Sequence, residues 1–205
     1  MSRLTPEIHQ LDRRIAVWQL YDPKVKADLS SAAIVTNGGT YLVDPVLLPS
    51  GATENLVADE PTGIIVTNEN HARATAALSR KLDLPVYAHK DARPGLQGLS
   101  VTPVAEGSAA IPGLEVIELN GGPRGEIALF DPVAGGTLLI GDALINFGSN
   151  GFALLPAKYC ENQKQLRKSL GKLLQFDFGR MLFAHGTPIL SNARTLLAEL
   201  LDAGN

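Results

Sequence analysis

The sequence contains a single cysteine, Cys160, among 205 residues. One thiol excludes an internal disulfide framework and a multi-cysteine zinc site. Charged residues are also scarce, at 19% of the chain against a usual value of about 25%, which excludes a charge-extended disordered chain. The formal net charge is -3, so no bulk basic field indicates nucleic acid as a partner.

Long apolar runs are absent as well. No stretch approaches the roughly 18 residues that a membrane helix needs, and residues 1–7 lack the apolar stretch of a secretory signal. We therefore expect a soluble, cytoplasmic protein without a membrane partner. Apolar residues still make up 45% of the chain, which is usual for a globular protein. Because no linker separates two halves, we expect one domain over residues 1–205.

Short apolar runs between turn residues predict many strands. In the first half, they predict strands at 14–20, 31–36, 40–43, 63–67 and 85–88. In the second half, they predict strands at 99–104, 114–119, 126–130, 137–140 and 180–184. Apolar residues at helical spacing predict helices at 72–82, 162–174 and 192–201. This layout indicates two packed sheets with helices on the outside, an α/β fold.

Four of the predicted strands lead into or follow polar segments. Layered α/β folds carry their chemistry on such loops, because rigid strands hold the loops in place. The segments are Thr67–Arg73, Asn120–Gly125, Gly141–Ala143 and Ala184–Pro188. They contain polar side chains that could carry chemistry, His71, Asp142 and His185 among them.

These segments, in this order, resemble the motifs of the metallo-β-lactamase superfamily. Thr40–Pro45 is similar to the family's early hairpin strand that ends in Asp, and strand 63–67 with its helix is similar to the element that carries H-x-H-x-D-H. The remaining matches are Leu119–Ile127 with P-G-H-T-P-G-S, Leu138–Ala143 with the G-D motif and Phe183–Gly186 with the final G-H-G. The resemblance covers about residues 14–190. It implies an αββα four-layer sandwich and a hydrolase in which two metal ions activate a bridging water.

The same resemblance implies that most of the family's metal ligands are missing. Asn68, Asn70, Ala72, Arg73 and Gly122 stand where the family has histidine or aspartate ligands. Only Asp142, the family's bridging aspartate, and His185, its last histidine, remain. Two ligands opposite a permanently charged guanidinium do not supply a two-metal centre. Our first hypothesis is therefore a metal-free site in which Arg73 replaces the cation and pairs with Asp142.

A shift of one residue in the first loop gives a second hypothesis. Glu69 and His71 then take the two leading positions, and together with Asp142 and His185 they could form a single-metal site for zinc or iron. Structural roles compete with both hypotheses. Asn68 and Asn70 suit turns, and Asp44 before Pro45 is expected to cap a turn.

The sequence therefore favours a superfamily member without the two-metal centre and without a cofactor. It would be a protein that binds a small molecule or another protein, or an enzyme with altered chemistry. The alternative is a metal-dependent hydrolase of esters, thioesters or amides with a reduced single-metal site. A third hypothesis is a structural role, in which Phe147, Phe152, Leu154 and Leu155 form an exposed apolar face for a homo-oligomer. The substrate is not predictable, because specificity depends on loop shape.

Overall fold

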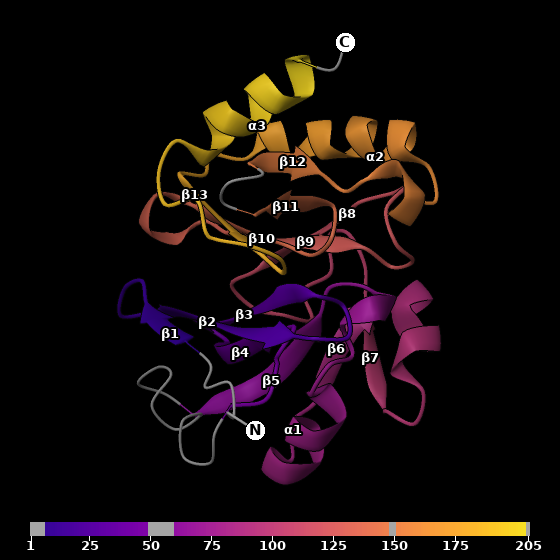
Figure 1. Cartoon of the computed structure of the whole chain (residues 1–205). Coiled ribbons are helices and arrows are strands. Elements are labelled where there is room, and N and C mark those ends of the chain that lie inside the picture. The colour runs from indigo at the N-terminus through magenta and orange to yellow at the C-terminus, as the bar shows by residue number, and fades with distance from the viewer. Residues whose placement is uncertain (1–6, 49–59, 148–150, 204–205) are drawn as a thin grey trace.

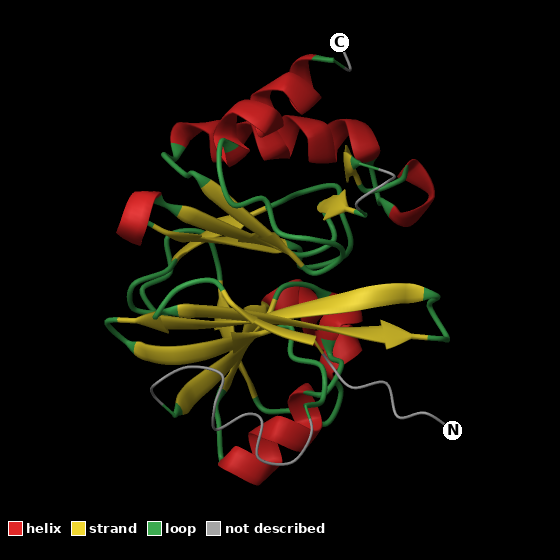
Figure 2. Ribbon diagram, turned by 60° about the vertical axis from the view of Figure 1, so that its left-hand side comes forward, coloured by secondary structure: helices red, strands yellow, loops and turns green. Residues whose placement is uncertain are grey.

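The computed structural model describes residues 7–48, 60–147 and 151–203. Its strands form two main sheets, one from each half of the chain, that face each other across the centre of the molecule (Figure 1). Helices lie on the outer side of each sheet (Figure 2). The αββα four-layer arrangement that the sequence predicts is confirmed.

The first sheet has seven strands, and their order in the sheet is their order along the chain. The first four strands pair antiparallel, and the fourth to seventh pair parallel. The strands are β1 (Glu7–Gln10), β2 (Ile15–Asp22), β3 (Ala27–Thr36), β4 (Gly39–Val43), β5 (Pro61–Val66), β6 (Val86–His89) and β7 (Val101–Val104).

The second sheet has four strands in the order β13-β10-β9-β8. The pair β10 and β13 is parallel, whereas the other two pairs are antiparallel. The strands are β8 (Glu115–Glu118), β9 (Ile127–Asp131), β10 (Thr137–Ile140) and β13 (Arg180–Phe183). A separate antiparallel hairpin, which the sequence pattern did not predict, consists of β11 (Leu144–Asn146) and β12 (Phe152–Leu154).

Three buried clusters hold the layers together. One lies between the two sheets, one lies under α1 (Thr75–Leu82), and one lies under α2 (Gln163–Leu170) and α3 (Ala193–Asp202). Successive side chains of a strand point to opposite faces, so a strand covered on both faces is apolar throughout. In β2, Ile15 and Val17 belong to the cluster between the sheets, while Ala16 and Trp18 belong to the cluster under α1.

The first helix begins later than its apolar pattern predicts. The sequence predicts a helix from residue 72, but residues Glu69–His71 form a separate 3-10 turn and α1 begins at Thr75. Arg73 lies between them with a φ of 38°, in the left-handed region that interrupts a right-handed helix. The predicted strand–helix–strand unit is otherwise present, with β5 and β6 parallel on either side of α1.

The second predicted helix is also shorter than its pattern. The α-helix α2 ends at Leu170 and continues as a 3-10 turn over Gly171–Gln175. Further 3-10 turns, which the sequence did not predict, cover Lys90–Leu96, Val133–Gly135 and Ala157–Tyr159. Within the described ranges, no helix is both long and apolar enough to cross a membrane.

The apolar stretch around β12 packs inward. Leu155 is buried, Leu154 packs against the cluster under α2 and α3, and the Phe152 ring lies 5.7 Å from the Phe183 ring, measured between centroids. The exposed apolar face expected from these residues and Phe147 is therefore not formed by Phe152, Leu154 and Leu155. Part of this Gly-rich stretch, residues 148–150, lies outside the described residues.

Gly186 gives a test of how tightly the end of β13 is packed. A Cβ atom at Gly186 would lie 1.9 Å from the Asn146 carbonyl oxygen, and the residue has a φ of +98°. Gly98 has a φ of +79°, but nothing lies within 4 Å of its Cβ position. We expect Gly186→Ala to lower the free energy of unfolding by about 2 kcal/mol more than Gly98→Ala in urea denaturation, since only the first adds a backbone clash. Equal losses in the two variants would contradict this packing.

Candidate functional site

Three possible metal ligands meet where parallel strands of both sheets end. His71 follows β5, Asp142 follows β10 and His185 follows β13. Asp142 Oδ1 lies 3.1 Å from His71 Nε2 and 3.2 Å from His185 Nε2. In the described part of the chain, this is the one group of three or more His, Cys, Asp or Glu side chains that could hold an ion, with ligand atoms within 4.8 Å of one another.

The 3-10 turn after β5 decides which side chain enters the site. The Asn68 side chain caps this turn, because its Oδ1 accepts a hydrogen bond of 2.8 Å from the Asn70 backbone N–H. The turn directs His71 into the interior, where it is 2% exposed, and leaves Glu69 half-buried. The structure thus brings His71 to Asp142 and His185, as the shifted alignment proposes, but it does not bring Glu69 into this group.

The Nδ1 atom of each imidazole, which lies on the side of the ring away from Asp142, faces an oxygen atom. His71 Nδ1 lies 2.8 Å from Asp44 Oδ2, and His185 Nδ1 lies 3.3 Å from the Asp28 carbonyl oxygen. A carbonyl oxygen can only accept, so His185 Nδ1 would be the donor in this contact when Nε2 binds an ion. Partners of this kind orient the imidazoles of metal sites and leave Nε2 for the ion.

Asp44 is a site residue that sequence reasoning missed, because Asp before Pro suggests a turn cap. Its side chain is buried and accepts from the Thr67 N–H at 2.8 Å and from the Thr67 hydroxyl at 2.5 Å. The same Thr67 Oγ1 lies 2.9 Å from His71 Nδ1. Asp44 therefore joins the end of β4 to the loop after β5 and fixes the His71 ring.

The second oxygen of Asp142 faces amide groups. Asn68 Nδ2 donates to Asp142 Oδ2 at 3.2 Å, and Asn70 Nδ2 donates to the same oxygen at 3.4 Å. The two asparagines that occupy the leading histidine positions of the resemblance thus act as hydrogen-bond donors. Asp142 consequently has imidazole nitrogens on one oxygen and amide donors on the other.

Glu126 fills the space beside these amides, and the sequence analysis did not single it out. It is 3% exposed; its Oε2 accepts from Asn68 Nδ2 at 2.7 Å and its Oε1 accepts from the Ala143 N–H at 3.0 Å. Gly122 lies beside it, where a Cβ atom would make an ordinary contact of 3.4 Å with Glu126 Cγ, whereas a Cβ atom at Gly141 would lie only 2.7 Å from Glu126 Oε1. Burial and the nearby Asp142 charge raise the pKa of Glu126 to about 8. The sequence feature that could have identified Glu126 is its place as an acidic residue directly before the apolar strand β9.

Arg73 lies behind the site and binds backbone. Its guanidinium donates to the carbonyl oxygens of Ser30 at 2.6 Å, Asp44 at 2.9 Å and Ala184 at 3.1 Å. Between these two described residues, no direct ion pair joins Arg73 to Asp142, so the pairing of our first hypothesis is wrong. The physical reason is that three carbonyl groups from three segments take up the guanidinium donors.

His71 is the positive group that touches Asp142. Burial opposes its charge, but Asp44 and Asp142 outweigh burial and raise the pKa of His71 to about 9. Burial would likewise raise the pKa of Asp142, but His71 and His185 hold it well below its usual value. Without a metal, the His71 imidazolium therefore lies between two carboxylates.

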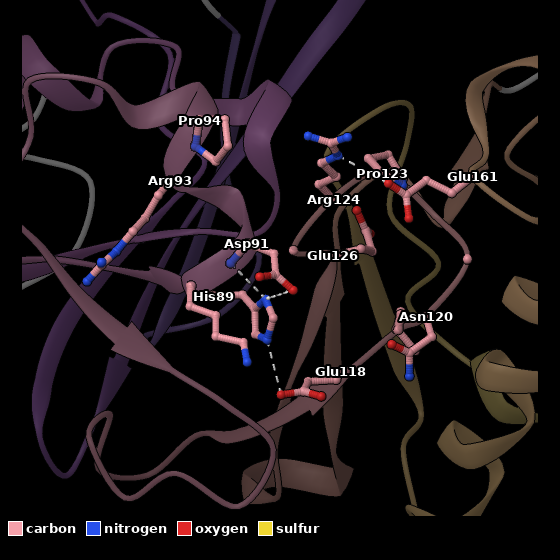
Figure 3. Close-up of a pocket in the computed structure, with 14 residues that line it drawn as sticks. His89, Asp91, Arg93, Pro94, Glu118, Asn120, Pro123, Arg124, Glu126 and Glu161 are labelled. Carbon is pink, nitrogen blue, oxygen red and sulfur yellow. Dashed lines mark hydrogen bonds and ion pairs between the residues drawn. The ribbon is translucent and has the colours of Figure 1, made fainter.

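Two cavities border the site. A cavity of about 660 Å³ opens over Asn70, Asp142 and His185. A second cavity, of about 510 Å³, is bordered by the loop that contains Gly121 and Gly125. Two pairs of side chains in this second cavity lie close together: His89 Nε2 lies 3.2 Å from Glu118, and Arg124 lies 3.3 Å from Glu161 (Figure 3).

Comparison with known proteins supports the family resemblance that the sequence motifs indicate. The family model described as the metallo-beta-lactamase superfamily matches residues 8–203. No curated protein matches the chain.

Similar solved structures cover nearly the whole chain. TTHA1623 in a di-iron-bound form is 24% identical, covers 89% of this chain and 97% of its own, and has a TM-score of 0.68. The mono-zinc form of FIM-1 from Pseudomonas aeruginosa is 12% identical over 98% of this chain and 96% of its own, with a TM-score of 0.75. A metallo-β-lactamase from Erythrobacter litoralis is 16% identical over 97% of this chain and 96% of its own, with a TM-score of 0.73. At these identities the likeness shows a shared fold.

The raised pKa values predict a loss of stability at alkaline pH. A group whose pKa is higher in the folded than in the unfolded chain stabilises the fold below the unfolded value, and this stabilisation is lost as pH rises through the folded value. For His71 these values are 6.5 and about 9, and Glu126 acts with the same sign. In urea denaturation with a chelator, we expect the free energy of unfolding to fall between pH 6.5 and 9, with His71 contributing on the order of 3 kcal/mol.

The His71→Gln variant should show a smaller fall over this range, while His9→Gln, which lies outside the site, should behave as the wild type. A wild-type protein with equal stability at both ends of the range would contradict the charge assignment.

Asn68→Asp tests the role of the amide donors. The change would replace a donor by an acceptor between Glu126 and Asp142, two groups that also accept. We expect a loss of about 3 kcal/mol in the free energy of unfolding at pH 7 without metal. The matched variant Asn120→Asp, at an exposed position, should cost less than about 0.5 kcal/mol. Similar losses for the two variants would show that Asn68 is not an obligatory donor.

Proposed function

The chain belongs to the metallo-β-lactamase superfamily, and we propose that it is a single-metal hydrolase of an ester, thioester or amide. The observation that carries this proposal is the convergence of His71 and His185 on one oxygen of Asp142. Two imidazoles and one carboxylate form a ligand set that suits zinc or iron.

The donor set fits one ion in three respects. Neighbouring ligands of a tetrahedral zinc ion lie roughly 3.3 Å apart, and Asp142 Oδ1 lies 3.1 and 3.2 Å from the two imidazole nitrogens. Both imidazoles present Nε2 toward the site, because their Nδ1 atoms face Asp44 and Asp28. The remaining oxygen of Asp142 is occupied by amide donors, which favours one ion over two.

Each nearby residue then has a defined role. His71, Asp142 and His185 would hold the ion, which when bound would supply Lewis acidity and a water of lowered pKa. Asp44 and the Asp28 carbonyl orient the imidazoles. The Asn70 amide borders the large cavity, where it can donate a hydrogen bond to a substrate oxygen. Asn68 lies behind Asp142 and donates to its carboxylate, and Glu126 orients Asn68 by accepting from the same amide.

A metal-free binding or catalytic protein is the second candidate, and a specific observation favours it. The His71 imidazolium already contacts Asp44 and Asp142, and it places a positive charge where a cation would otherwise lie. In this form the protein would bind a small molecule in the same cavity without a cofactor. A cytoplasmic location is proposed for either form.

Metal analysis separates the two candidates. We expect wild-type protein, stripped with chelator, loaded with Zn²⁺ or Fe²⁺ and desalted, to retain about one ion per chain by plasma mass spectrometry. His185→Ala should lower the metal affinity at least about tenfold, because it removes one of three ligands. His9→Ala, on the exposed strand β1, should retain the wild-type content.

The same samples test hydrolysis with 4-nitrophenyl acetate. Activity should disappear with chelator and return with the ion. A folded protein that holds no stoichiometric metal would refute the single-metal proposal and favour the metal-free candidate, and two ions per chain would refute both.

A further inference from the structure

The large cavity over the candidate metal ligands has a polar floor and apolar walls. Asp142, His185 and Asn70 form the floor. The walls include Phe147 and Leu155. The Phe147 ring centroid lies 6.2 Å from that of His185, so the apolar wall begins directly beside a proposed metal ligand. A group attached to a carbonyl at this floor would therefore meet apolar surface.

The rim of this cavity exposes large apolar side chains to water. Val25 and Tyr159 are each 59% exposed, and Tyr21 is 43% exposed. They come from two separate parts of the chain: Tyr21 lies at the end of β2 and Val25 in the turn after it, whereas Tyr159 lies in the segment before α2. Exposed apolar groups that gather around a hollow mark a binding surface, because their exposure costs free energy that an apolar ligand would recover.

Charge distinguishes this cavity from the one beside it. Among the described lining residues, the charged groups are Asp142 at the floor, the exposed Lys26 in the turn after β2 and the exposed Asp28 at the start of β3. Away from the proposed metal ligands, Lys26 is the only cation of this set, and one exposed lysine does not suit a phosphate or a polyanion in the part of the cavity that would hold the acyl group. The second cavity is lined by several cations, Lys90 and the two residues Arg93 and Arg124 that Figure 3 labels.

We infer that the substrate is an ester or thioester of an uncharged apolar acid, with a medium-length aliphatic or an aromatic acyl group in the 660 Å³ cavity. This inference rests on the proposed hydrolase function. The reaction adds water across the acyl bond: the hydroxyl joins the acyl carbon, the bond to oxygen or sulfur breaks, and the alcohol or thiol leaves with the proton. Such a cavity has the size that small-molecule sites usually have.

The acyl preference is tested with metal-loaded protein and 4-nitrophenyl esters from acetyl to decanoyl. Each methylene that enters the apolar cavity should raise kcat/KM about twofold to fourfold, up to the length that the cavity holds. Val25→Asp and Tyr159→Asp should lower the ratio of octanoyl to acetyl kcat/KM about tenfold, since each places a charge on the apolar rim. Val133→Asp is the matched control, because Val133 is 48% exposed and lies outside the cavity.

A binding measurement separates failure of this inference from failure of the hydrolase proposal. The neutral fluorophore N-phenyl-1-naphthylamine should bind the protein with or without metal, be displaced by 1-octanol, and bind at least about fivefold more weakly to Val25→Asp than to Val133→Asp. If no ester is cleaved but the fluorophore behaves in this way, the hydrolase proposal fails and the apolar ligand chemistry stands. Equal acyl ratios in Val25→Asp and Val133→Asp, or no binding of the fluorophore, would overturn the inference.

Discussion

The carboxylate of Asp142 is the group on which the whole site depends. Its side chain is 11% exposed, and a carboxylate removed from water to this degree needs donors or positive charge around it. Imidazole nitrogens supply these on one oxygen, and amide groups supply them on the other. Because these partners follow strands of both sheets, the site exists only when the two sheets are packed together.

Two residues beside the site have backbone conformations that cost free energy, and hydrogen bonds from a side chain stabilise this part of the backbone. Asp44 has a φ of 47° and Arg73 has a φ of 38°, both in the left-handed region that non-glycine residues seldom occupy. Arg73 Nη1 donates to the Asp44 carbonyl and Nη2 donates to the Ala184 carbonyl. One side chain therefore connects the support of His71 with the strand end that carries His185, and so relates the two sheets across the site.

The family supplies the fold, but the donor groups decide the chemistry. Solved structures of the same fold include forms described as di-iron-bound and mono-zinc, at identities of 24% and 12%. In this chain, Asn68 and Asn70 present N–H donors to Asp142, and Glu126 bonds to one of the same amides. The two amides satisfy one oxygen of Asp142 without a cation and leave the other oxygen to two imidazoles. A fold can carry many functions, and here the difference lies in a few polar side chains.

The sequence by itself determined the layered architecture and named part of the site. Strands such as Ile15–Trp18 and Leu138–Ile140 were predictable, because a strand buried on both faces is apolar at every position. His71, Asp142 and His185 were predictable as candidates from their places after strands and from the order of the motifs. These are local properties, which neighbouring residues in the chain decide.

Only the tertiary structure decided which polar groups meet. The contacts that define the site join residues far apart, such as Asp44 with His71 and Asn68 with Glu126, and no local pattern encodes such pairs. A 3-10 turn of three residues also decided that His71 and not Glu69 faces inward. Side-chain direction in a short turn depends on packing against the rest of the molecule, so the roles of Asp44, Arg73 and Glu126 became visible only in three dimensions.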